Sequence, residues 1–453
     1  MKKLLMLSAC VTTLAAATTY AGEHPHRHQT HHGNSDAKVA ELMAKLDAMQ
    51  HRLDQLEKAA ASKEKAVTEA SQTGLAVNSG TKKLSLELSG QMNRAVQIAG
   101  DGERTRTKHV DNDTDPSQVR VVARGKMSDD FSVGAKWEVA AKSNNTSLAS
   151  MGETTGQSAD GGNIVENRKA EVMLESKRYG KLSLGRGNLA SYNITGDTDQ
   201  SATNPVALGS NFHDAAGGVY FTTPAGSTTV GNGGLGLRVI DLADGMKGFR
   251  DNRVRYDTPK FFNAITLSAS HMGRENDTYD FAARFDHEIG SVKVRAGASL
   301  MQAHLTNGGP KANKDVYQQY LGTASVLFPI GINLQGTIGK RDFSKPGVRS
   351  GNIWVAKLGY ILKYFKIGHT AFAIDYGQFN EMFPAVKANG EKYKLKGFGA
   401  FIVQNYEDIS TDLYVGMRRY NVSVGTLTTS LGGSVPGDYR GVTAVLAGGR
   451  VVF

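Results

Sequence analysis

The chain has 453 residues, a formal net charge of +10 and 52 glycines against only 10 prolines. Scarce proline excludes a Pro-rich disordered chain, and abundant glycine suits a fold with many turns. The basic residues are spread along the chain rather than gathered in one block, so we expect no nucleic-acid partner.

Residues 1–21 are typical of a secretory signal peptide. Two lysines precede a stretch rich in Leu, Ala and Thr, and a small-residue cleavage site ends at Ala21. The single cysteine, Cys10, follows a sequence that resembles a lipoprotein box, but that alternative leaves an apolar run of only about six residues. The mature chain is therefore expected to have no cysteine and no disulfide.

Residues 22–34 include EHPHRHQTHHG, with five closely spaced histidines. Imidazoles at this spacing can bind zinc, copper or nickel. No cysteine or fixed scaffold sets a coordination geometry, however. We therefore predict a disordered segment and assign no metal ligand and no cofactor to the chain.

Residues 35–62 are predicted to form a self-associating coiled-coil helix, followed by a linker over 63–82. Ser35 or Asp36 can cap the helix, and apolar residues then recur at alternating spacings of three and four. The alternative is a single amphipathic helix on a globular core, but nothing globular lies nearby in sequence. The predicted coiled-coil core consists of Val39, Leu42, Leu46, Met49, Leu53 and Leu56.

Residues 83–453 change to a hydrophobic period of 2, which indicates β-strands. In FSVGAKWEVAAK, for example, Trp137 and its apolar neighbours share one face, whereas Lys136 and Glu138 lie on the other. Strands of a soluble sandwich average five or six residues, but many segments here run nine to twelve, which suffices to cross a bilayer at a tilt. The many charges on the polar face exclude a dry core. The mature part contains no run of eighteen or more apolar residues, so no membrane-spanning helix is predicted.

The alternation predicts an all-β transmembrane fold, a barrel of sixteen antiparallel strands. Short connections such as MSDD, KRYG and PIG alternate with mostly longer loops, as in bacterial barrels. An even strand number places both ends of the chain on one side of the membrane. The predicted strands lie near 84–98, 117–127, 131–142, 165–176, 181–187, 252–257, 264–272, 278–287, 291–301, 315–328, 332–341, 352–361, 369–377, 394–404, 410–420 and 442–453.

The chain ends AGGRVVF, with Val451 and the terminal Phe453 on the apolar face of the last strand. This ending is similar to the assembly signal by which outer-membrane barrels are recognised by their insertion machinery, although Gly449 is smaller than the usual residue. LSGQMNRAV, DNRVRYDTPKF, VAKLGY, TAFAIDYG and VQNYEDISTDLYVGMRRY resemble segments of the general porin family of Gram-negative proteobacteria. The resemblance covers residues 84–453 and is weakest between Asn188 and Phe249.

The resemblance implies a homotrimer of sixteen-stranded barrels in the outer membrane, each narrowed by an inward-folded third loop. The coiled-coil prefix is similar to that of porins with an N-terminal periplasmic coiled coil, some of which take up dicarboxylates. Both termini would then be periplasmic. The expected partners are other copies of the chain, outer-membrane lipids, the insertion machinery, small polar solutes and, through the coiled coil, the cell wall.

Alternation also predicts which charged side chains line the pore. The predicted basic lining is Arg120, Arg124, Lys126, Arg253, Arg255, Arg284, Lys293 and Arg295. The predicted acidic lining is Glu138, Glu171, Asp280 and, from the third loop, Asp197 and Asp199. A basic wall facing acidic groups would orient polar solutes and concentrate anions. The alternative is that these residues form ordinary ion pairs with no part in selection.

Arg94 shares the outward parity of Leu88 and Met92. An arginine facing lipid near the midplane costs about 2–4 kcal/mol. Either a bulge resets the parity of the strand, or Arg94 faces a subunit interface. We expect the interface.

The expected function is passive diffusion of small polar solutes through a water-filled channel, with a preference for anions such as carboxylates. The alternative is a structural anchor whose coiled coil tethers the outer membrane to the cell wall. A barrel enzyme is not expected, because His271, His287 and His369 are scattered and no Ser/His/Asp arrangement stands out.

Overall fold

The computed structural model describes residues 75–78, 84–152, 165–209, 211–223, 238–273, 277–304, 316–344, 349–382, 393–424, 427–428, 434–435 and 439–453. The chain divides into two compact units, Met1–Ala70 and Ser71–Phe453. The signal peptide, the histidine-rich segment and the coiled coil with its core residues lie outside the described ranges, so they stay predictions.

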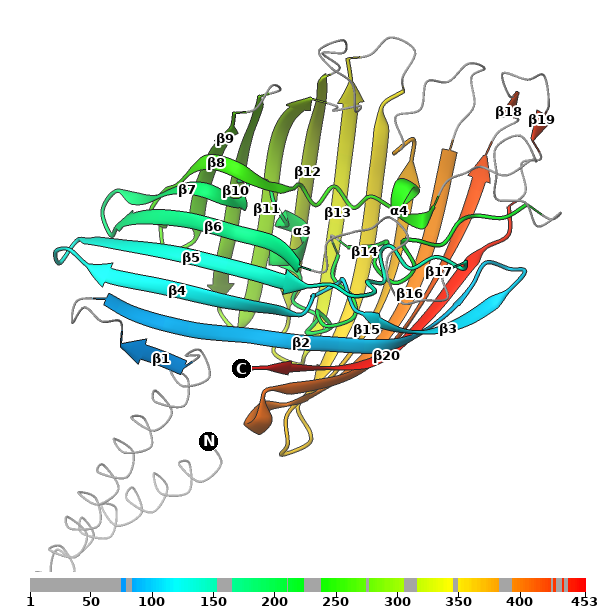
Figure 1. Cartoon of the computed structure of the whole chain (residues 1–453), viewed down its shortest axis with the longest axis horizontal. Helices are drawn as coiled ribbons and strands as arrows, with labels where there is room; N and C mark the ends of the chain where they lie inside the picture. Colours follow the sequence, from blue (N-terminus) through cyan, green and yellow to red (C-terminus); the bar gives the residue numbers. More distant parts are fainter. Residues whose placement is uncertain are drawn as a thin grey trace, which may run out of the picture. The chain divides into compact units, whose positions relative to one another are not determined.

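Within the described ranges, sixteen antiparallel strands form a closed barrel (Figure 1). Each strand pairs with the next along the ring, and each overlaps one predicted segment, which confirms the predicted barrel. The strands are β2 (Leu84–Gly100), β4 (Gln118–Lys126), β5 (Phe131–Ala141), β6 (Val165–Ser176), β7 (Gly180–Asn188), β8 (Arg250–Asp257), β9 (Ile265–Met272), β10 (Thr278–Ile289), β11 (Val292–His304), β12 (Val316–Leu327), β13 (Ile332–Phe343), β14 (Gly351–Leu362), β15 (Thr370–Asn380), β16 (Tyr393–Tyr406), β17 (Thr411–Val424) and β20 (Val442–Val452).

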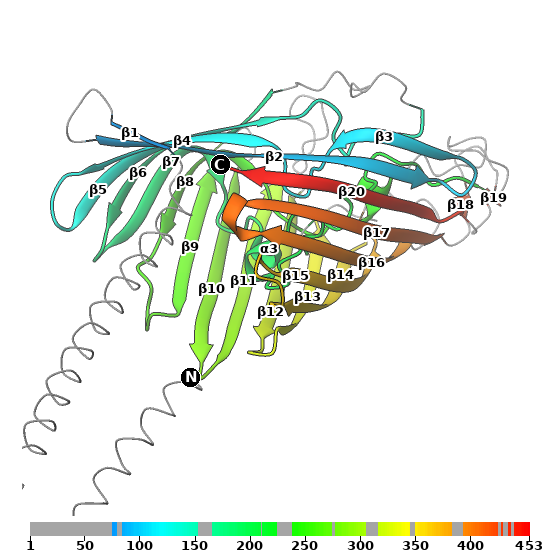
Figure 2. The same ribbon diagram turned by 90° about the horizontal axis from the view of Figure 1, so that it is seen from below.

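Closure occurs where β20 lies between β17 and β2 (Figure 2). The terminal residue Phe453 exchanges two backbone hydrogen bonds with Gly90, of 2.7 and 3.0 Å. A side chain at position 90 would collide with the Phe453 ring, because a Cβ atom there would lie 2.8 Å from Cζ. The residue predicted as the assembly signal is therefore part of the seam that closes the barrel.

Four further strands supplement the ring. β3 (Thr105–Asp111) pairs with the same side of β2 as β4 does, so the two lie in line, separated by residues 112–117. β1 (Leu75–Asn78) also pairs with β2 and lies inside the predicted linker 63–82. β18 (Leu427–Thr428) and β19 (Ser434–Val435) form a separate hairpin. These short strands lack the long apolar alternation that revealed the other sixteen.

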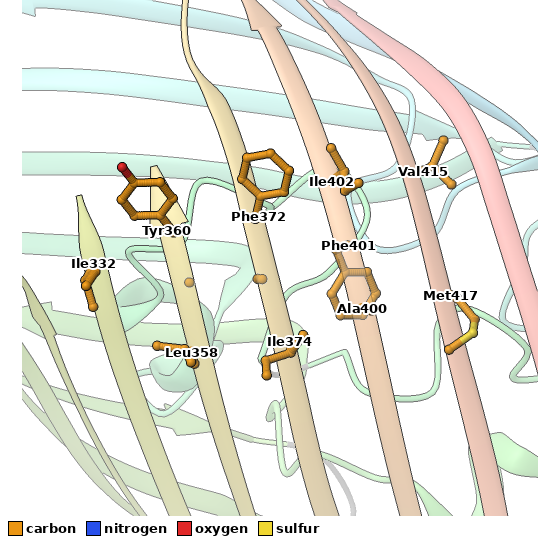
Figure 3. Close-up of a pocket in the computed structure, with 12 residues that line it drawn as sticks. Ile332, Leu358, Tyr360, Phe372, Ile374, Ala400, Phe401, Ile402, Val415 and Met417 are labelled. Carbon is orange, nitrogen blue, oxygen red and sulfur yellow. The ribbon is translucent and has the colours of Figure 1, made fainter. Parts of the chain in front are cut away.

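Apolar side chains cover the outside of the wall, and polar ones face the inside. Trp137, Leu184 and Ile338 are 54–69% exposed, whereas Glu138 and Asp280 are fully buried. Figure 3 shows part of the outer surface, a hollow of about 600 Å³ between β13 and β17 that is lined almost entirely by carbon atoms. A water-soluble protein has the opposite arrangement. Lipid outside and polar groups inside satisfy both faces, and the closed ring leaves no backbone edge in the hydrocarbon.

Helical structure is sparse within the described ranges. α3 (Ile194–Thr198) and α4 (Val239–Leu242) lie between β7 and β8, and η1 (Glu407–Ile409) is a single 3-10 turn. In the part of the chain that the structure describes, no helix has the length and apolar character needed to cross a membrane.

The two tryptophans of the chain test this assignment of faces, because Trp137 and Trp354 both point outward and are 56% and 40% exposed. In reconstituted vesicles, lipids with brominated acyl chains should quench most of the tryptophan fluorescence. Aqueous iodide should quench little, since water reaches only the inner face. Strong iodide quenching with weak lipid quenching would show that the apolar face does not meet lipid.

Candidate functional site: the barrel interior

Of the residues between β7 and β8, the structure describes 189–209, 211–223 and 238–249, and these are held by side chains that point into the barrel. Their backbone carbonyls accept hydrogen bonds from inward-facing side chains of strands far apart in the ring. Gln335 donates to Thr195 at 2.7 Å and Gln319 to Met246 at 3.1 Å. We call these described residues the β7–β8 segment. The remaining wall-to-carbonyl bonds include those from Gln97 to Ala215 and from Tyr420 to Phe212, both at 2.8 Å.

An apolar core joins the β7–β8 segment to one side of the wall. Phe212, Phe221, Val239 and Leu242 are at most 2% exposed and belong to one cluster with residues of β14 to β20. On that side the inward-facing side chains are covered, and those of Leu395, Phe401 and Tyr420 are at most 3% exposed. Across the barrel, the side chains of Arg120, Arg124 and Arg295 remain 36–65% exposed. Solvent therefore reaches these three arginines, which lie on β4 and β11.

A buried ion pair adds a charged anchor to this contact. Lys357 of β14 donates to Asp199 at 2.7 Å and to the carbonyl of Ala207 at 3.0 Å. The two charged side chains are 2% and 1% exposed. Asp199, a predicted acidic lining residue, is therefore engaged with the wall rather than open to water. Asp280 is also fully buried and accepts hydrogen bonds from the Ser191 backbone, at 2.6 Å, and the Ser270 hydroxyl.

On the opposite wall, Glu138 is enclosed by three cations. Arg120, Arg168 and Lys169 lie 2.8, 3.0 and 2.9 Å from its carboxylate. Since one carboxylate faces three cations, the cluster keeps a net positive charge.

Both Arg168 and Lys169 face inward because a β-bulge shifts the register of β6 against β5 between Glu138 and Val139. A bulge inserts one extra residue and breaks the alternation of faces. Strict period-2 reasoning therefore could not place both cations in the lumen. Lys136 also faces inward. Its position two residues before Glu138 on the same strand predicts this, because no bulge separates the two.

The other predicted lining residues face inward and mostly have acidic partners. Arg253 pairs with Glu171 in a buried contact. The pairs closer to solvent are Arg255–Asp257 at 2.7 Å, Arg284–Asp197 at 3.0 Å, Arg295–Asp286 at 3.6 Å, Arg124–Glu87 at 3.3 Å and Lys126–Asp129 at 2.7 Å. Lys293 is exposed, and its backbone carbonyl accepts a hydrogen bond from Gln200 of the β7–β8 segment. Their part in selecting solutes stays a prediction.

Arg94 faces outward without any reset of the strand parity, because its neighbour Asn93 is fully buried on the inner side. Its guanidinium pairs with Asp111 of β3 and donates to the Ser143 hydroxyl at 3.0 Å. The charge thus has partners within the chain. Contact with a second subunit stays a prediction.

A histidine lies inside the β7–β8 segment. His213 Nε2 is 3.1 Å from the Asp214 carboxylate, and Nδ1 is 3.2 Å from the carbonyl of Ala243. Burial alone would lower the pKa of this imidazole, but Asp214 and, further away, Asp244 outweigh burial and raise that pKa above its usual value. Within the described ranges, no three His, Cys, Asp or Glu side chains gather into a metal site.

Comparisons with known proteins agree with this architecture. The model of the Gram-negative porin family matches residues 59–425. The anion-selective porin from Comamonas acidovorans is 15% identical with a TM-score of 0.55, and the match covers 82% of this chain and 100% of that one. OmpF of Salmonella typhi, in complex with daunomycin, is 15% identical with a TM-score of 0.52, covering 84% and 100%. OmpT of Vibrio cholerae, in its trimer form, is 12% identical with a TM-score of 0.51, covering 82% and 100%.

At these identities the structural likenesses concern the fold alone. No curated protein sequence matches the chain.

The Lys357–Asp199 pair leads to a stability prediction. Lys357→Met leaves Asp199 buried without its partner, which should lower the free energy of unfolding by about 3–5 kcal/mol. Thermal unfolding in detergent, followed by loss of β-sheet signal, measures the effect. Lys340→Met is the control, because the Lys340–Asp342 pair is 58% and 35% exposed and should contribute at most about 1 kcal/mol. Equal unfolding temperatures for both variants would contradict a buried anchor.

The raised pKa of His213 leads to a pH prediction. A group whose folded pKa is raised adds stability that is complete below its unfolded value, about 6.5, and is lost as pH rises through the folded value. Wild type should therefore exceed His213→Gln in unfolding temperature most strongly in mild acid, and the difference should shrink in alkali. A difference that grows with pH would mean that His213 is held neutral.

Proposed function

The chain belongs to the Gram-negative porin family, and from this premise we propose that its outer-membrane channel passes small polar solutes by diffusion, with a preference for anions such as carboxylates. The observation that carries the proposal is the contrast between the two sides of the interior. One side is filled by the β7–β8 segment and its apolar core. The other side carries solvent-exposed arginines and lysines.

We infer that the β7–β8 segment is the third external loop, folded inward as the constriction of the channel. The hydrogen bonds to Thr195, Ala215 and Met246 and the buried Lys357–Asp199 pair support this inference. They attach the segment to the wall at several points around the ring. The open path is then confined to the side formed by β4 to β11.

The charge along that path supports the preference for anions. Three cations surround the single carboxylate of Glu138, and one of them, Arg120, is 36% exposed. The exposed side chains of Arg124 and Lys126 are each paired with one carboxylate, those of Glu87 and Asp129, and add no net charge. Exposed cations in a narrow, low-dielectric passage raise the local concentration of anions. Asp199 and Asp280 do not offset this charge, because both are buried against the wall or its loop.

The assembly and topology of the chain form further parts of the proposal. The barrels associate as trimers, an arrangement in which OmpT of Vibrio cholerae is described. A signal peptide directs export, and Phe453 serves as the insertion signal. The even number of strands supports both termini lying on one side of the membrane, and we propose that this side is the periplasm. The coiled coil at 35–62 would then be periplasmic. It joins the subunits or, in the anchor alternative, tethers the membrane to the cell wall.

Reversal potentials in planar bilayers under a salt gradient test the selectivity. Wild type should favour the anion, and Arg124→Gln or Arg120→Gln should shift the reversal potential toward the cation, because each removes an exposed positive charge from the path. Arg178→Gln is the control, since Arg178 lies in the turn between β6 and β7, over the ring of Tyr179.

A cation-selective wild type whose reversal potential neither lumen variant changes would contradict the anion preference. A folded barrel that conducts no current would favour the anchor.

A further inference from the structure

Two glycines on neighbouring strands form a socket in the inner wall. Gly377 of β15 and Gly397 of β16 are register partners, and both lie on the buried inner face together with Phe379 and Leu395. A Cβ atom at Gly397 would overlap Cε1 of Phe212 and lie 2.8 Å from its Cζ. A Cβ atom at Gly377 would lie 3.0 Å from Cε2 of the same ring and 2.9 Å from Cε2 of Phe379, which packs against that ring. The Phe212 ring therefore occupies the space that two side chains would fill.

The other sides of the Phe212 ring are also in contact. Phe379 packs against it with centroids 4.9 Å apart, and Tyr420 meets it edge-on at 6.2 Å. The guanidinium carbon of Arg418 lies 3.8 Å from the ring centroid. The Tyr420 hydroxyl donates to the Phe212 carbonyl at 2.8 Å. The side chain of Phe212 is therefore fixed by packing and its backbone by a hydrogen bond, and the residue is fully buried.

Similar contacts recur elsewhere in the β7–β8 segment. A Cβ atom at Gly297 of β11 would lie 2.5 Å from Cγ2 of Ile194, and one at Gly416 of β17 would lie 2.6 Å from Cγ2 of Val206. Inward-facing glycines thus receive apolar side chains of this segment on several strands.

We propose that Gly377 and Gly397 are positioning residues that set how close the β7–β8 segment lies to the wall, and thereby the cross-section of the channel. This inference rests on the proposed function. Non-bonded carbon atoms pack at about 3.5–4.0 Å, so a methyl group at position 397 moves the Phe212 ring inward by roughly 1 Å. The segment lies between this wall and the open path, and its inward movement narrows that path.

The expected effect differs from that of an ordinary strand glycine. Glycine weakens a strand interior, and alanine there is neutral or favourable where nothing opposes its methyl group. Gly336 of β13 provides this case, because a Cβ atom there would have no heavy atom within 4 Å. Gly336→Ala is therefore the matched control for the same chemical change in the same barrel.

The experiment compares single-channel conductance and the entry of neutral sugars of increasing size into vesicles for wild type, Gly397→Ala, Gly377→Ala and Gly336→Ala. The gel mobility of unheated protein shows that each barrel is folded. We expect the two socket variants to lose conductance and to admit only smaller sugars, with Gly397→Ala affected more strongly. Gly336→Ala should match wild type. In Gly397→Ala/Phe212→Ala, removal of the ring should restore conductance.

Conductance of folded Gly397→Ala equal to or above that of Gly336→Ala overturns the inference, and so does a double variant that stays as narrow as the single one. If Gly397→Ala does not fold, the milder Gly377→Ala decides by the same criteria. A wild type that conducts no current would instead contradict the proposed channel. The two failures are therefore distinguishable.

Discussion

Closure of the hydrogen-bonded ring is the constraint on which the rest of the structure depends. In hydrocarbon each unsatisfied backbone group costs several kcal/mol, so a sheet can cross the membrane only if no edge remains. β20 meets β2 and β17, and Phe453 completes the seam at Gly90. Once the ring is closed, alternation of side chains turns apolar residues such as Trp137 toward lipid and leaves polar ones such as Glu138 inside. The interior is therefore available for polar solutes.

The interior is not an empty tube, and its filling is asymmetric. An apolar core and a buried ion pair attach the β7–β8 segment to the β14 to β20 side, and hydrogen bonds such as that from Gln335 attach it to β13 and to other strands around the ring. The apolar core and the Lys357–Asp199 pair are buried and have no contact with water. The cations of β4, in contrast, are exposed to water. The sealed contacts hold the segment in place, and the exposed charges are left to act on solutes. The charged residues that stabilise the fold are thus different from those proposed to select solutes.

Much of the barrel was predictable because lipid and water impose a period of 2 on long strands. Each of the sixteen predicted segments overlaps an observed strand. Alternation could not place both Arg168 and Lys169 inward, because the bulge in β6 interrupts it. It also could not separate Asp197, which is 44% exposed, from Asp199, which is buried against Lys357. Those two aspartates lie two residues apart in a segment without regular alternation.

The sequence by itself determined the strand count and the membrane environment, because these follow from local alternation and composition, and the resemblance of several segments to known porins indicated the family. Only the tertiary structure decided which inward charges meet water, how the β7–β8 segment lies against the wall and why Gly377 and Gly397 carry no side chain. The physical reason is that burial and steric fit arise between residues such as Phe212 and Gly397, which are remote in the chain. A periodic pattern specifies the face on which a residue lies, but it does not specify what packs against that face.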